Sequence, residues 1–137
     1  METQDNTSGL APDLDIIEAL ALSAIDALPQ EFRHHARAVQ LRVAELAPDD
    51  MLSDLRIKDP FELTGLYDGI PLTEKSLGDI ADRPDTIWLF RRAILDEWVA
   101  RGNVDLRDLV SHVLVHELAH HFGWTDDDIA RIDRWWE

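Results

Sequence analysis

The sequence predicts a small α+β domain, and the order of its apolar patterns leads to this prediction. A helical pattern comes first in the chain, three strand-like segments follow it, and helical patterns complete it. The length of 137 residues is typical of one domain with a modest core. We therefore expect a single domain at residues 12–137, preceded by a disordered tail at residues 1–11.

The first helix is indicated by apolar residues spaced three and four apart between Pro12 and Pro29. Pro12 and Asp13 are typical of a helix start, and Pro29 ends the pattern because proline cannot continue a helix. The segment that follows, residues 30–37, is interpreted as a polar connection. A later loop is compatible with one helical turn at residues 49–55.

Three segments are predicted to form strands. Residues 38–46, AVQLRVAEL, alternate apolar and polar side chains around Val39, Leu41 and Val43, which is the period of a half-buried strand. Residues 61–72 form a second strand that ends in a turn, where Gly69 supplies a flexible corner and Pro71 stops the ladder. Residues 86–92, TIWLFRR, are rich in β-branched and aromatic side chains and form the third strand.

The C-terminal third is predicted to be helical. Residues 93–102 form a short helix, and residues 105–121 form the strongest helix of the chain. Asp105 lies in its first turn, where the helix macrodipole favours negative charge. Gly123 ends it, because glycine adopts the left-handed conformation of a helix C-terminus without strain. A last short helix occupies residues 125–137.

Composition excludes several classes of function. The formal net charge of −15 makes nucleic acid and anionic membranes poor partners, since their phosphates would be repelled. The chain has no cysteine, so disulfides and thiolate chemistry are excluded, and a metal would have to bind histidine and carboxylate. Neither a secretory signal nor a membrane-spanning run is visible, which favours the cytoplasm. The sequence does not specify an oligomeric state.

The segment HELAH at residues 116–120 has the HExxH pattern of zinc peptidases. Residues four apart lie on one face of a helix, so His116 and His120 can hold one zinc ion. Glu117 lies about 100° around the helix from His116, beside the metal, where it can accept a proton from zinc-bound water. The spacing thus assigns two metal ligands and one general base. The alternative is a helix whose histidines merely face water.

Catalytic zinc usually takes three protein ligands, so a third is needed. The left-handed turn at Gly123 can bring an acidic side chain back toward the metal, and Asp126 is the first choice. An alternative explanation is helix capping, because Thr125 followed by Asp128 resembles a capping arrangement. The other candidates for the third ligand are Asp127, Asp128 and Asp133.

Other polar residues receive more ordinary interpretations. His112 shares the face of His116, but helical rise keeps it about 12 Å from His120, so these two residues cannot bind one ion. His112 is therefore expected to contact a metal ligand or to line the cleft. His121 is expected to be packed or on the surface, and His34 is expected to be solvated. Tyr67, the only tyrosine, could steady an oxyanion, but packing in the sheet is the simpler explanation.

The sequence resembles the minimal zincin group, small bacterial proteins described as metallopeptidase-like. The similar segments are HELAHHFGWTDDDIARID at 116–133, LTGLYDGIPL at 63–72 and TIWLFRR at 86–92. The resemblance implies a three-stranded mixed sheet packed against an N-terminal helix and the motif helix. It also implies zinc bound by His116, His120 and Asp126, with Glu117 as the base.

These observations lead to the hypothesis of a zinc-dependent peptidase-like hydrolase, in which water activated by Glu117 attacks a peptide carbonyl. The substrate would be a peptide or protein, held by strand addition at an edge strand for which residues 86–92 are the candidate. Preparations without zinc are compatible with this hypothesis, because protonated histidines release metal. The main alternative is a non-catalytic interaction or regulatory module that retains the fold with a vestigial or empty metal site. A further alternative is a metal-dependent hydrolase that acts on something other than a peptide, because the motif specifies water activation and not the substrate.

Overall fold

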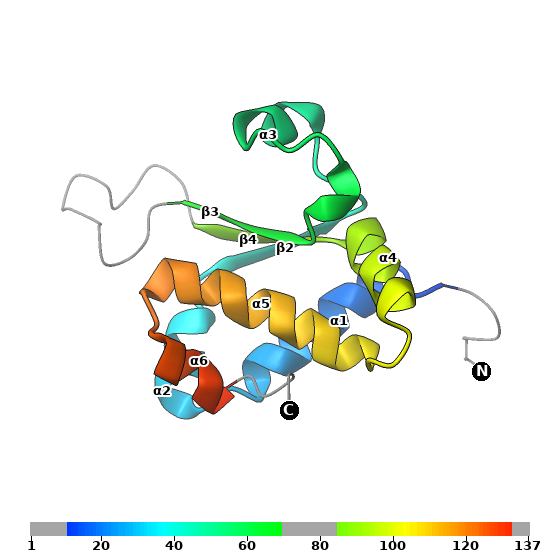
Figure 1. Cartoon of the computed structure of the whole chain (residues 1–137). Helices are drawn as coiled ribbons and strands as arrows, with labels where there is room; N and C mark the ends of the chain where they lie inside the picture. Colours follow the sequence, from blue (N-terminus) through cyan, green and yellow to red (C-terminus); the bar gives the residue numbers. More distant parts are fainter. Residues whose placement is uncertain (1–10, 70–84, 133–137) are drawn as a thin grey trace.

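The structure, a computed structural model, describes residues 11–69 and 85–132. Its centre is a three-stranded sheet of β2 (Gln40–Ala44), β3 (Gly65–Asp68) and β4 (Thr86–Phe90), in the order β2-β4-β3 (Figure 1). β2 runs parallel to β4, and β3 runs antiparallel to it. The α+β class and the mixed three-stranded sheet are therefore confirmed.

β4 is the central strand, so the prediction that residues 86–92 form an edge strand for a peptide is wrong. The physical reason is that both faces of this strand are covered. Ile87 and Leu89 belong to the main core, whereas Phe90 belongs to a second cluster against which Trp88 packs. A strand that is apolar on both faces is favoured at the centre of a sheet, where neighbours also satisfy its backbone groups.

The helices surround this sheet. α5 lies along one face with α1 beside it, and α3 lies on the opposite side (Figure 1). In chain order the helical elements are α1 (Leu14–Asp26), α2 (Gln30–Ala36), α3 (Asp49–Asp54), the 3₁₀ turn η1 (Pro60–Glu62), α4 (Arg91–Arg101), α5 (Leu106–Phe122) and α6 (Asp126–Ile132). No helix within the described residues is both long and apolar enough to cross a bilayer.

Local signals predicted most of these helices. Asp13 caps α1 by accepting a hydrogen bond from the Ile16 N–H at 2.9 Å. The turn expected at residues 49–55 is α3. α2 was not expected, because its seven residues carry only two buried apolar side chains, Phe32 and Ala36, within a polar segment.

Some sequence predictions fall outside the described residues. These are the disordered tail, apart from Ala11, the end of the strand predicted at residues 61–72, and the end of the last helix. Within the described part the second strand is shorter than predicted, because η1 occupies its beginning.

The main core lies between the sheet and the helix pair α1 and α5. Ile17 and Ala21 of α1 have no exposed surface, and Leu109 and Val110 of α5 are equally buried. This packing holds α5 against β3 and β4, so it fixes where the HELAH segment lies in the fold.

Candidate metal and catalytic site

α5 carries the HELAH residues, and both of its ends are set by local interactions. Asp105 caps the N-terminus by accepting a hydrogen bond from the Arg107 N–H at 3.0 Å. Gly123 ends the helix in the left-handed conformation, with φ 66°, as the sequence predicts. Leu114 and Leu118 face the core, so the polar residues of the motif lie on the opposite and lateral sides of the helix.

Glu117 is the polar residue of the motif that contacts the sheet. Its side chain is only 17% exposed, and its Oε1 accepts a hydrogen bond from the backbone N–H of Tyr67 at 2.9 Å. The same oxygen lies 3.8 Å from Nδ1 of His120. Burial raises the pKa of Glu117, while His120, the Tyr67 N–H and His116 oppose the rise without cancelling it. A carboxylate with a raised pKa is better suited to accept a proton at neutral pH.

The two motif imidazoles have different surroundings. His120 is on the surface, with 71% of its side chain exposed. His116 is half-buried, its Nε2 is below the surface, and its ring lies 4.3 Å from the ring of His112. The contact between these rings places His112 beside the motif, where helical spacing predicts it.

Asp126 lies in the first turn of α6 and is exposed. The neighbouring residues form a reciprocal capping box: the Asp128 N–H donates to Thr125 Oγ1 at 3.1 Å, and the Thr125 N–H donates to Asp128 Oδ2 at 3.0 Å. The capping explanation of this acidic run is therefore supported for Asp128, whose pKa these hydrogen bonds lower.

No three histidine or carboxylate side chains converge as a metal site within residues 11–69 and 85–132. His116 and His120 match the kinds of ligand that zinc takes, but they supply two of the usual three. Asp126 as the third ligand stays a prediction, and Asp133 lies outside the described residues.

A buried pair beside the motif was missed by the sequence interpretation. His121 is only 5% exposed, and its Nδ1 lies 3.3 Å from Asp85 Oδ2. The ring of Tyr67 packs against His121 with the ring centroids 5.1 Å apart. Packing, the simpler explanation, thus applies to the Tyr67 ring. No signal in the sequence pairs Asp85 with His121, because they belong to elements far apart in the chain.

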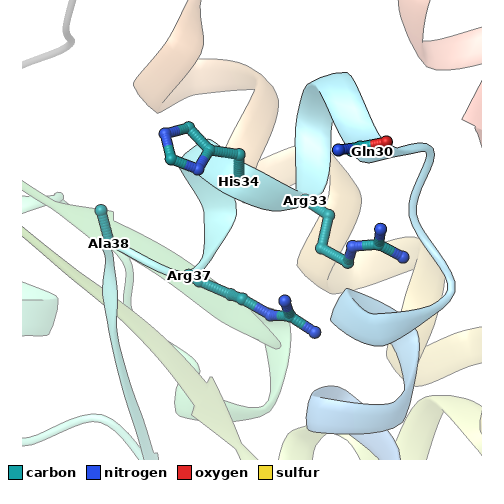
Figure 2. Close-up of a pocket in the computed structure, with 5 residues that line it drawn as sticks. All are labelled: Gln30, Arg33, His34, Arg37 and Ala38. Carbon is teal, nitrogen blue, oxygen red and sulfur yellow. The ribbon is translucent and has the colours of Figure 1, made fainter.

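The cavities among the described residues include two of about 440 Å³ each. One is lined by Gln30, Arg33, His34, Arg37 and Ala38, and in Figure 2 the Arg33 and Arg37 side chains extend to the same side. It includes no motif residue, and Arg37 already pairs with Asp26 at 2.7 Å. The other cavity lies between α3 and β3 and includes Tyr67, which contacts Glu117. Neither cavity is lined by a residue of the motif helix.

A family model described as zincin-like metallopeptidase matches residues 36–136. The chain belongs to this family. The match includes the whole sheet and the motif helix of this zincin-like protein, whereas α1 precedes it. The resemblance inferred from the sequence is thereby confirmed. No curated protein matches the chain.

The raised pKa of Glu117 determines how the stability of the metal-free protein should depend on pH. In the unfolded chain the pKa has its ordinary value of 4.5, so the folded chain binds the Glu117 proton more tightly. Between this value and the raised pKa, the folded chain carries more protons than the unfolded chain. The contribution of Glu117 to the free energy of unfolding is therefore present at low pH and lost as the pH rises through this window.

Glu117→Gln removes this titration. We expect the variant to gain stability relative to the parent as the pH is raised from about 4 to about 7. Urea unfolding of both proteins in the presence of a chelator measures the difference, and Glu62→Gln, at an exposed position, is the matched control. A difference that stays constant, or that favours the variant more at low pH, would contradict the assignment.

Proposed function

We propose that this zincin-like protein is a zinc-dependent peptidase-like hydrolase in which Glu117 is the general base. The observation that carries this proposal is the environment of Glu117. Its carboxylate is mostly buried, has a raised pKa and lies 3.8 Å from an imidazole of the same HExxH helix. Within a metallopeptidase-like family, this arrangement favours activation of water over a purely structural role.

The proposed ligands of zinc are His116, His120 and Asp126. Zinc, when bound, polarises a carbonyl group and makes water more acidic. The protein's own contribution is to hold a proton acceptor nearby. Glu117 accepts a proton from the attacking water and can return it to the leaving amine, and its burial prevents bulk water from competing for the carboxylate.

The peptide substrate is proposed to lie along β3. Within the described residues β3 pairs with β4 alone, so its other side is an edge that can accept a further strand. This edge contacts the motif, because the Tyr67 N–H donates to Glu117. The cavity between β3 and α3 can receive a side chain of the added peptide, since alternate side chains of a strand point to each face.

Zinc titration tests the metal ligands directly. At about pH 7.5, where histidine is neutral, the parent should bind one zinc ion per chain. His116→Ala and His120→Ala should each weaken binding by more than about a hundredfold, beyond the usual loss from an outer-sphere partner. His34→Ala, at an exposed position on α2, should leave binding unchanged.

The same titration examines the third ligand. Asp126→Asn should weaken zinc binding, whereas Asp127→Asn should not. A loss with Asp127→Asn alone would reassign the ligand within the same turn. A parent protein that binds no zinc at micromolar concentration would reject the hydrolase and favour the alternative, a non-catalytic interaction module with the same fold. The titration includes the interaction module as an outcome because no three ligands converge among the described residues.

A further inference from the structure

β3 directs one of its backbone donors away from the sheet. The Phe90 N–H donates to the Thr64 carbonyl at 2.9 Å, which defines a hydrogen-bonded pair at that rung of the β3–β4 ladder. Hydrogen-bonded and non-hydrogen-bonded pairs alternate in an antiparallel ladder. Tyr67 is opposite Ile87, three rungs from the first pair, so its N–H points away from β4 and toward the outer edge.

This edge donor is engaged by the proposed base. The Tyr67 N–H donates to Glu117 Oε1 at 2.9 Å, and the bond is partly buried. The same carboxylate oxygen faces His120. One oxygen of Glu117 therefore lies against two groups: the strand edge at which a peptide would add and the imidazole of a proposed zinc ligand.

Gly65 permits the close approach of β3 and α5. A Cβ atom at this position would lie 2.7 Å from Val113 Cγ1, 3.2 Å from the Trp88 backbone oxygen and 3.5 Å from Glu117 Cγ. The first distance is shorter than carbon atoms tolerate, so a side chain here would push the strand away from the helix. The hydrogen bond between Tyr67 and Glu117 thus depends on the missing side chain of Gly65.

We propose that Glu117 closes the edge of β3 in the free protein and that an added peptide strand opens it. The proposal rests on the function proposed above. A carbonyl of the incoming peptide accepts the hydrogen bond of the Tyr67 N–H in place of Glu117, and the Glu117 carboxylate is released to act as the base. The base becomes available when a peptide is in place, which couples substrate binding to activation of water.

The coupling follows from the strengths of the competing hydrogen bonds. A hydrogen bond to a carboxylate is stronger than a hydrogen bond to a neutral carbonyl. The cost of displacing the Glu117 carboxylate from the Tyr67 N–H therefore opposes peptide binding. Coupling between two events is reciprocal. The bound peptide must therefore weaken the hydrogen bond between Glu117 and the Tyr67 N–H by the same factor by which this hydrogen bond lowers the affinity for the peptide.

The test uses the full chain without metal, so it does not depend on hydrolysis. Hydrogen exchange of the Tyr67 amide is measured by NMR in the parent, Glu117→Ala and Glu117→Gln. We expect exchange to be at least about tenfold faster in Glu117→Ala, with Glu117→Gln between the two because its amide oxygen still accepts a hydrogen bond. The matched control is Glu62→Ala, a substitution of an exposed glutamate just before β3, which should change nothing.

The probe for strand addition is a blocked, uncharged hexapeptide of alternating threonine and valine, so that net charge does not affect its binding. It should bind Glu117→Ala about tenfold more tightly than the parent, and it should shift the Tyr67 amide signal in both. Equal affinity for the two proteins, or binding to neither, would overturn the proposal. Unchanged exchange in Glu117→Ala would also overturn it.

A second pair of variants tests the same contact without changing Glu117, so the result does not depend on the folding of Glu117→Ala. Gly65→Ala should expose the Tyr67 amide to exchange, because the new methyl group meets Val113. Adding Val113→Ala removes the nearest clashing atom but leaves the 3.2 Å approach to the Trp88 backbone oxygen, so it should restore part of the protection. Failure of this rescue counts against the proposal. Zinc binding and hydrolysis, measured separately, show whether the proposed function fails on its own.

Discussion

Glu117→Gln is expected to lower kcat for peptide hydrolysis by at least about a thousandfold while zinc binding is retained. The glutamine amide has nearly the shape of the carboxylate, so it can still accept the Tyr67 N–H that holds Glu117 in place. It cannot take a proton from water at neutral pH. The variant therefore separates the proposed proton-transfer role of Glu117 from its structural role.

The measurement uses the zinc-loaded protein and a mixture of quenched fluorescent peptides, with zinc content determined on the same samples. Glu62→Gln serves as the matched control, because Glu62 is exposed and outside the motif, and it should have the parent's rate. Equal rates for Glu117→Gln and the parent would refute Glu117 as the base. A parent that binds zinc but cleaves nothing would favour the interaction module.

Ile17→Ala is expected to reduce the free energy of unfolding by about 2–5 kcal/mol. Ile17 has no exposed surface, and it lies in the main core between α1 and α5. Removing its outer methyl groups leaves a cavity under the helix that carries the HELAH residues. The loss is a large part of the roughly 5–15 kcal/mol that stabilises a typical domain.

The adjacent Ile16→Ala is a closely matched control. Ile16 is 39% exposed, so the same chemical change should cost less than about 1 kcal/mol. Urea unfolding of the two variants and the parent measures both values. Similar losses for the two variants would show that α1 does not pack as described. This matters because α1 precedes the part of the chain that the family model matches.

The motif helix could be predicted in detail because its determinants are local. Asp105 and Gly123 are neighbours of the backbone groups that they cap, and the spacing of His116 and His120 acts within one helical turn. The capping box at Thr125 is equally local. The family itself was also accessible, since the HELAH segment and its surroundings carry the resemblance.

The order of the strands could not be predicted from their patterns. Residues 86–90 show a strand with apolar side chains on both faces, but the pattern does not state which segments pair with it. Strand pairing depends on chain segments that are distant in the sequence. For the same reason α2 was missed, because its two buried side chains gain their stability from contact with the rest of the fold.

The sequence by itself determined the chemistry that is available on α5: two imidazoles one turn apart with a carboxylate between them. Only the tertiary structure decided what this carboxylate does at rest. The tertiary structure places the edge of β3 against Glu117, where Gly65 permits the close approach, and it buries His121 beside Asp85. The physical reason is that helical spacing is set by bonds along the chain, whereas these contacts form only when elements distant in the sequence pack together.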